Sequence, residues 1–211
     1  MSRLWVTTWV WGTKYGPDYI DKLRGSIARN LTEPYEFRVI ETDDPLTQEK
    51  GCFARLRAFD PYWQAQLGCD PGDRIVCMDL DLVVTGSLDG LFDRKEPFVI
   101  LTGVNASNPC PYNGSLWMVR AGHRPDVWAD FSLEAAAKVP FDSFPDDQAW
   151  MAHKLPGAGA FGPVQGVYGF HKPGWPKGEG LPRGARIVAF PGWRDPVGFQ
   201  HLDWVQSHWK A

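Results

Sequence analysis

Long apolar runs are absent from this sequence: no stretch approaches the roughly 18 consecutive apolar residues of a membrane-spanning helix. The chain also shows no charged-then-apolar leader, because Met1-Ser2-Arg3 runs directly into the strand-like segment Leu4-Trp5-Val6. We therefore expect no integral membrane segment and a cytoplasmic location.

Clustered positive charge is absent as well. The chain has 22 Lys and Arg against 25 Asp and Glu, which gives a net charge of -3 at pH 7, and neither basic residue forms a run. Proteins that bind nucleic acids usually carry a basic patch that neutralises phosphates. We therefore expect no nucleic-acid partner.

Cysteine is scarce and scattered. Its positions, Cys52, Cys69, Cys77 and Cys110, form no Cys-x-x-Cys pair, which argues against a zinc ribbon or a thioredoxin-like site. Free thiols in a reducing compartment fit this spacing. Tryptophan, by contrast, occurs 11 times; indole rings can stack on sugars, but we expect most of them to fill the core.

The most informative segment is 74–84, in which two carboxylates interrupt an apolar run. Ile75-Val76-Cys77-Met78 is typical of a buried strand, Asp79 and Asp81 follow, and the apolar run resumes at Leu82. Buried carboxylates are costly unless they are paired or bind a cation, so the two acids suggest a hard metal such as Mn²⁺ or Mg²⁺. The alternative is that the strand ends at Met78 and both acids lie in a solvated turn. We favour the metal interpretation because the apolar run resumes directly after Asp81.

The segments before Asp79 alternate between strand and helix patterns, an order typical of an α/β unit with a parallel sheet. They predict strands at 4–10 and 36–40, a third strand from Arg74 that carries Asp79, a helix from Pro17 to about Leu31, and a helical segment at 53–67 that Pro61 breaks and Gly68 closes. The later segments predict strands at 98–101, 114–119 and 186–190, and helices at 125–138, from Pro145 and at 201–210.

Ligands of such sheets bind beyond the carboxyl ends of the strands. The loop 11–16 and the pair Asp79/Asp81 follow two of these strands, so we expect them to face one pocket. A nucleoside diphosphate held through a metal at the two acids, with its base near Tyr15, is the occupant that fits. We expect the loops 105–111 and 155–184 to contact an acceptor, although the glycine-rich 155–184 can equally be a surface connection.

Four short motifs occur in an order that resembles a known family. They are Phe53-Ala54-Arg55-Leu56, Asp79-Leu80-Asp81, Tyr112-Asn113-Gly114-Ser115 and Asp147-Gln148. Over nearly the whole chain the sequence resembles the GT-A glycosyltransferases, most closely the retaining nucleotide-sugar transferases of family 8. The resemblance implies an α/β, Rossmann-like GT-A fold with a mixed central sheet in a single domain, 1–211. The nucleotide would bind to about 1–100, and the sugar and acceptor to about 101–211.

The resemblance also implies a donor site. Asp79 and Asp81 would bind Mn²⁺, or Mg²⁺ as a substitute, against the diphosphate of a UDP-sugar, and Arg55 would add a fixed positive charge there. The partners would be this donor and a carbohydrate or other hydroxyl acceptor. The donor-binding residues that the resemblance implies are Thr8, Lys14, Tyr15, Arg55, Asp79, Asn113, Gly114, Gly192 and Arg194.

Gln148 and Asp147 are the catalytic residues that the resemblance implies. Gln148 resembles the residue that the family places close to the anomeric carbon. An amide is a poor nucleophile, so stabilisation of an oxocarbenium-like centre, with acceptor attack on the leaving-group face, fits better than a covalent intermediate. Asp147 would orient this region or contact the sugar. The alternative is that Asp146-Asp147-Gln148 only caps a helix.

One late motif departs from the family pattern His-x-x-Gly-x-x-Lys-Pro. The corresponding stretch, 189–196, keeps Gly192 and its Pro but has Ala189 in place of the metal-binding His and Asp195 in place of the Lys. Another group would then complete the metal, or the metal would bind more weakly, or activity would be lost. The candidates for the third ligand are His171, His201 and Asp195, and those for the missing cation are Arg194 and Lys172.

Two other functions compete with this one. A degenerate transferase would bind a nucleotide sugar or glycan without turnover, as the missing His and Lys suggest. A phosphatase of the haloacid dehalogenase type also places Asp-x-Asp after an apolar strand. In that family, however, the motif normally lies on the first strand and a Thr stands two residues after the second Asp, where this chain has Val83.

Overall fold

The computed structural model describes residues 2–104, 109–141 and 145–211. Two sequence expectations fall partly outside these ranges. Residues 105–108 of the expected acceptor loop and Phe144, before the expected helix at Pro145, are not among the described residues.

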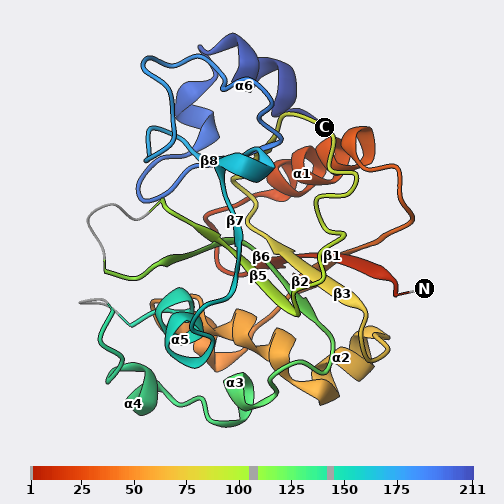
Figure 1. Ribbon diagram of the computed structural model, residues 1–211, viewed down its shortest axis with the longest axis vertical. Helices are drawn as coiled ribbons and strands as arrows, with labels where there is room; N and C mark the ends of the chain where they lie inside the picture. The colour runs from red at the N-terminus through yellow and green to blue at the C-terminus, as the bar shows by residue number, and fades with distance from the viewer. Residues whose placement is uncertain (1, 105–108, 142–144) are drawn as a thin grey trace.

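A six-stranded mixed sheet with the order β2-β1-β3-β6-β5-β7 forms the centre of the protein (Figure 1). The first three strands in this order are parallel, β6 runs antiparallel to both β3 and β5, and β7 is parallel to β5. The strands are β1 (Leu4–Val10), β2 (Glu36–Glu41), β3 (Arg74–Met78), β5 (Phe98–Thr102), β6 (Tyr112–Arg120) and β7 (Gly159–Phe161). The expected mixed sheet is therefore confirmed.

Helical layers cover both faces of this sheet (Figure 1). α1 lies on one face, and α2, α3 and α5 lie on the other. The α-helices are α1 (Pro17–Asn30), α2 (Pro61–Leu67), α3 (Asp126–Ala129), α4 (Leu133–Ala136), α5 (Asp147–Lys154) and α6 (Asp203–His208). Short 3₁₀ helices are η1 (Pro45–Gln48), η2 (Phe53–Phe59), η3 (Pro163–Gln165) and η4 (Pro196–Phe199).

The central strands are buried on both faces because their side chains alternate between two cores. Leu4 and Val6 of β1 pack with α1 in one core, whereas Trp5 and Trp9 pack with η2 and α5 in the other. A strand covered on both faces is apolar throughout rather than at every second residue, which explains the continuous apolar run in β3.

A second, three-stranded sheet carries the C-terminal part of the chain. Its strands are β4 (Val83–Val84), β9 (Ile187–Ala189) and β8 (Val167–Gly169), in the order β4-β9-β8. A third core beneath this sheet contains Phe170, Phe190 and Trp209. α6 lies at the top of the view in Figure 1, above α1.

One sequence prediction of a helix needs correction, and the break predicted at Pro61 in another is confirmed. The segment 125–138 is not one helix but the short helices α3 and α4, because α3 ends by Asp130 and the Ser132 side chain starts a new helix by accepting from the Ala135 N–H at 3.0 Å. Similarly, 53–67 is the 3₁₀ helix η2 followed by α2. Asp60 caps α2 before Pro61, and Gly68 ends it at φ +92°, as expected.

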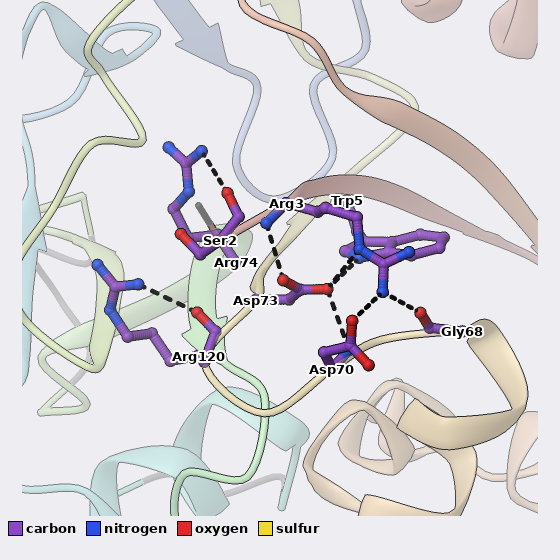
Figure 2. Close-up of polar contacts among 9 residues, drawn as sticks. Ser2, Arg3, Trp5, Gly68, Asp70, Asp73, Arg74 and Arg120 are labelled. Atoms are coloured by element: carbon purple, nitrogen blue, oxygen red, sulfur yellow. Dashed lines mark hydrogen bonds and ion pairs between the residues drawn. The ribbon is translucent and has the colours of Figure 1, made fainter.

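The buried carboxylate of Asp73 fixes the amino end of the sheet, opposite the carboxyl ends of β1 and β3 (Figure 2). It accepts from the Arg3 N–H at 2.8 Å, from Trp5 Nε1 at 3.1 Å and from the Asp70 N–H at 3.1 Å, and it pairs with the Arg3 guanidinium. These donors hold the pKa of Asp73 below its usual range although burial alone would raise it. This network therefore holds β1 and β3 in register.

Candidate active site

The two acids of the Asp-x-Asp motif lie in a turn that is largely buried. β3 ends at Met78, so both acids follow the strand, as the alternative interpretation proposed. The turn is nevertheless not a solvated one: Leu80 and Leu82 are each 1% exposed and Asp81 is 8% exposed. The Asp79 N–H donates to the Ser115 carbonyl of β6 at 2.9 Å, which fixes the turn to the neighbouring strand.

A cavity of about 320 Å³ opens at the carboxyl ends of β1 and β3. It lies between the loop after β1, the turn after β3 and the loop after β9. Lys14 and Tyr15 line it together with both acids, so the expectation that the loop 11–16 and Asp79/Asp81 share one pocket is confirmed. Asn113 and Gly192 line it too, as predicted.

Trp9 and Trp11 also line this cavity, and sequence reasoning did not single them out. Trp9 is 7% exposed, and its indole nitrogen is buried without a hydrogen-bond partner within the described structure. The signal available was their position at the carboxyl end of β1, the edge where ligands of parallel sheets bind. Thr8, which was predicted to line the nucleotide, is fully buried and does not reach the cavity. Thr8 points to the opposite face of β1 from Trp9, and its contact with a nucleotide stays a prediction.

Asp81 is linked to the loop after β1 by a short polar chain. The Tyr15 hydroxyl donates to Asp81 Oδ2 at 2.7 Å, and Lys14 Nζ donates to the Tyr15 oxygen at 2.5 Å. Burial and the neighbouring Asp79 raise the pKa of Asp81 to about 7. Burial and Asp81 also raise the pKa of the Tyr15 hydroxyl, which therefore stays protonated and remains a donor.

Arg55 joins the two predicted motifs that flank the cavity. Its side chain, only 6% exposed, donates from Nη1 to Asp79 Oδ1 at 2.5 Å and to the Gly114 carbonyl at 2.9 Å. Its Nη2 forms an ion pair with Asp147 Oδ2 at 2.7 Å. The two carboxylates raise the pKa of Arg55 against the effect of burial, so the guanidinium is a permanent positive charge.

Asp146, Asp147 and Gln148 at the start of α5 have three different roles. Asp146 is the N-cap and accepts from the Ala149 N–H at 2.7 Å, so the capping interpretation holds for this residue. Asp147 is not a cap: it is 2% exposed, and burial raises its pKa to about 7 although Arg55 acts in the opposite direction. Gln148 Oε1 accepts from the Gly114 N–H at 3.0 Å, which orients its amide.

Gly114 lines the smaller cavity beside this site and also supports the side chains around it. Both of its backbone polar groups are engaged, the carbonyl by Arg55 and the N–H by Gln148. A Cβ at this position would lie 2.6 Å from Arg55 Nη2, so only glycine leaves room for the guanidinium. The direct contact of Gly114 with the donor stays a prediction, and this supporting role is an addition to it.

A second cavity of about 150 Å³ adjoins the first and shares Cys52, Arg55, Asp79, Asn113 and Ser115 with it. Asp146, Asp147 and Gln148 line its far side. All three carboxylates around this smaller cavity are engaged, two with Arg55 and Asp146 with a backbone N–H.

Most of the candidates for the missing His and Lys lie apart from Asp79 and Asp81, and Asp195 is the exception. No histidine is among the described residues that line either cavity at this site. His171 stacks on Phe170 with ring centroids 4.0 Å apart, and His201 is exposed near Glu179. Asp195 is the exception: it accepts from the Tyr19 hydroxyl at 2.8 Å, and its charge helps to raise the pKa of Asp81.

Arg194 and Lys172 do not line the larger cavity. The Arg194 guanidinium lies over the Trp193 ring, 5.2 Å from its centroid, directly after the cavity-lining Gly192. Lys172 lies beside His171 at a separate shallow surface hollow. Arg194 follows two residues after Gly192, which lines the larger cavity.

Solved glycosyltransferases have the same architecture as this chain. GlyE of Streptococcus pneumoniae TIGR4 aligns with a TM-score of 0.61 at 12% identity over 98% of this chain, and its apo form with 0.58 at 11%. A glycosyltransferase involved in the glycosylation of the major capsid of PBCV-1 aligns with a TM-score of 0.56 at 14% identity over 94% of this chain and 98% of its own. The chain has a GT-A fold.

The present chain spans 63% of the length of the GlyE chain. No family model matches the sequence, and no curated protein does. Family 8 membership therefore stays a prediction. Within the described ranges, no helix is long and apolar enough to cross a membrane.

The donor set at the turn after β3 fits a hard divalent cation. Asp79 and Asp81 offer carboxylate oxygens on the wall of the larger cavity, and with Asp147 they make three carboxylates against two cations, Arg55 and Lys14. Among the described residues, no group of three His, Cys, Asp or Glu is arranged to hold a metal. The protein would thus supply two ligands, and phosphate or water oxygens the others, as is usual for Mg²⁺-type sites.

Proposed function

We propose that this protein is a metal-dependent glycosyltransferase that moves a sugar from a nucleotide-diphosphate donor, a UDP-sugar, to a hydroxyl acceptor with retention of configuration. The observation that carries the proposal is the position of Asp79 in the wall of both adjoining cavities of a GT-A fold, with Asp81 beside it in the wall of the larger one. The larger cavity suits a nucleotide with its phosphates, and the smaller one suits a single sugar ring.

Both aromatic and charged side chains line the larger cavity. Trp9, Trp11 and Tyr15 provide flat surfaces for a base, while Asp79, Asp81 and Arg55 lie where a diphosphate would approach the smaller cavity. Mn²⁺ or Mg²⁺, held by the two acids, would neutralise charge on the departing diphosphate. Arg55 is fixed by its two ion pairs, so it needs no reorganisation to face that charge.

Retention by attack on the leaving-group face is supported by the state of the carboxylates. A covalent glycosyl intermediate requires a nucleophilic carboxylate next to the anomeric carbon. Asp147 is buried and paired with Arg55, and Asp146 caps α5. Gln148 retains a second lone pair on Oε1 and is the group suited to stabilise a positive anomeric centre. Asp147 positions Arg55 rather than attacking.

The test is release of UDP from a panel of UDP-sugars with Mn²⁺, followed by transfer to simple glycosides. Wild-type protein should release UDP, whereas Gln148→Ala should lose turnover while binding UDP normally. Asp21→Asn, an exposed carboxylate on α1, is the matched surface control and should behave as wild type. Absence of UDP release from every donor, with UDP still bound, would instead support the degenerate binding protein.

The phosphatase hypothesis has a separate test. Turnover of p-nitrophenyl phosphate that requires Mg²⁺ and is lost in Asp79→Asn would overturn the transferase proposal. In the structure, Asp79 is tied to Arg55 at 2.5 Å, a pairing that weakens a carboxylate as a nucleophile.

A further inference from the structure

Trp193 differs from every other tryptophan in the chain. The structure describes all 11 indole side chains, and Trp193, at 82% exposed, is the one that lies largely in solvent. The others are buried or half-buried. Single exposed apolar side chains are common, so exposure alone carries no argument. The position of Trp193 beside the cavity is the informative feature.

The loop that carries Trp193 is a wall of the larger cavity. Phe190, Pro191 and Gly192 line that cavity, and Gly192 turns the chain at φ +84° immediately before Trp193. Trp193 itself is not a lining residue. It therefore stands at the rim, where it would meet a molecule that enters after the nucleotide rather than the nucleotide itself.

Both ends of this loop are anchored, so the backbone that carries the indole is held beside the cavity. On one side, Phe190 is 3% exposed and packs on Phe170 with ring centroids 5.0 Å apart. On the other side, Asp195 accepts from the Tyr19 hydroxyl at 2.8 Å, and the Tyr19 ring contacts Tyr15 of the cavity wall at 5.0 Å. A ring positioned in advance loses little entropy when a ligand packs on it.

We propose that Trp193 is the platform on which a pyranose ring of the acceptor stacks, with Arg194 bonding its hydroxyl groups. This inference rests on the proposed function. A sugar ring has an apolar face of C–H groups that matches the electron-rich indole face. Arg194, whose guanidinium lies 5.2 Å from the indole centroid, brings five N–H donors to the same spot. An apolar surface with donors beside it is the chemistry that recognises a carbohydrate.

The test is saturation-transfer NMR with methyl β-glucoside, methyl β-galactoside and N-acetylglucosamine as probes, at saturating UDP and Mg²⁺. At least one probe should bind wild-type protein, and Trp193→Ala should weaken that binding by about tenfold, the loss expected when a stacked ring loses its aromatic partner. Trp193→Phe should keep most of it. Tyr62→Ala, which removes an exposed aromatic ring from α2, should have no effect.

Two results would overturn the inference: no probe binds while UDP does, or Trp193→Ala binds the probe as tightly as wild type. Failure of the proposed function is seen separately, because UDP would then not be released from any UDP-sugar with Mn²⁺, whatever the probes do. Trp193 is exposed, so circular dichroism should show both variants folded as wild type.

Discussion

Arg55 is the residue whose loss should cost the protein most at this site. Its guanidinium holds Asp79, Asp147 and the Gly114 carbonyl in a pocket where it is itself 6% exposed. Arg55→Met keeps much of the volume but removes the charge. Asp79, whose side chain is 31% exposed, can recover water, whereas Asp147, at 2% exposed, cannot.

The expected cost follows from that difference in burial. Removing one partner of a buried ion pair typically destabilises a protein by about 3–5 kcal/mol, because the other charge stays buried and unpaired. For a chain of this length each kcal/mol corresponds to roughly 2–4 °C in Tm, so we expect a fall of about 6–20 °C. Arg24→Met, which breaks an exposed pair with Asp21, should cost about 1 kcal/mol or less.

The destabilisation should also depend on pH in one direction. Burial raises the pKa of Asp147 to about 7 in the folded protein, so its stabilising contribution is complete below the unfolded pKa of about 4 and is lost as pH rises toward 7. Arg55 opposes that shift, so its removal raises the pKa of Asp147 further and extends the loss to higher pH. Arg55→Met should therefore be closer to wild type at about pH 5 than at about pH 8.

The assay is thermal and urea unfolding, followed by circular dichroism, at both pH values. Adding Asp147→Asn to Arg55→Met should recover part of the stability at the higher pH, because the unpaired charge is gone. If Arg55→Met unfolds at the same temperature as Arg24→Met, with the same pH dependence, the buried ion pair does not support the site and this account of Arg55 is wrong.

Three further substitutions test other parts of the structure. Gly114→Ala should lower stability by about 1–3 kcal/mol and weaken UDP binding, because its Cβ would lie 2.6 Å from Arg55 Nη2; Gly198→Ala, whose Cβ meets nothing within 4 Å, is the control in unfolding and UDP titrations. Asp73→Asn should cost about 1.5–3 kcal/mol by unfolding, since it weakens three charge-assisted bonds, yet leave UDP affinity unchanged; altered affinity would show that the two ends of the sheet are coupled. Ser132→Ala should destabilise by about 1 kcal/mol in the same assay, and no change would show that the cap of α4 is immaterial.

Local patterns predicted the elements whose type and ends depend on their own residues. The apolar run of β1, the Pro17 start of α1 and the Gly68 end of α2 are as expected. The N-cap residue Ser132 was a local signal for the break inside 125–138. The apolar residues keep a helical spacing across the break, so the periodicity predicted one helix instead of two.

The site was predicted in its motifs but not in its contacts. The family resemblance brought Arg55, Asp79 and Asp147 to one place, and the structure shows them joined. It did not show that Arg55 is shared between both acids, because those contacts join residues 24 and 92 positions apart in the chain. The resemblance also did not show that the missing Cβ of Gly114 leaves room for the guanidinium of Arg55.

For tryptophan, the composition predicted the general role of the indole side chains but not the position of each one. The expectation that most indoles fill the core is confirmed, since ten of the 11 are buried or half-buried. Composition could not say which one is exposed at the rim of the cavity, or that Trp9 and Trp11 form its wall.

Calorimetric titration of UDP tests the central claim most directly. With Mn²⁺ present, wild-type protein should bind UDP, and binding should be lost with excess chelator and in Asp81→Asn but kept in Asp21→Asn, which changes an exposed carboxylate. UDP affinity that is the same with chelator, or unchanged in Asp81→Asn, would contradict the metal assignment. Absence of UDP binding under every condition would contradict the nucleotide site itself.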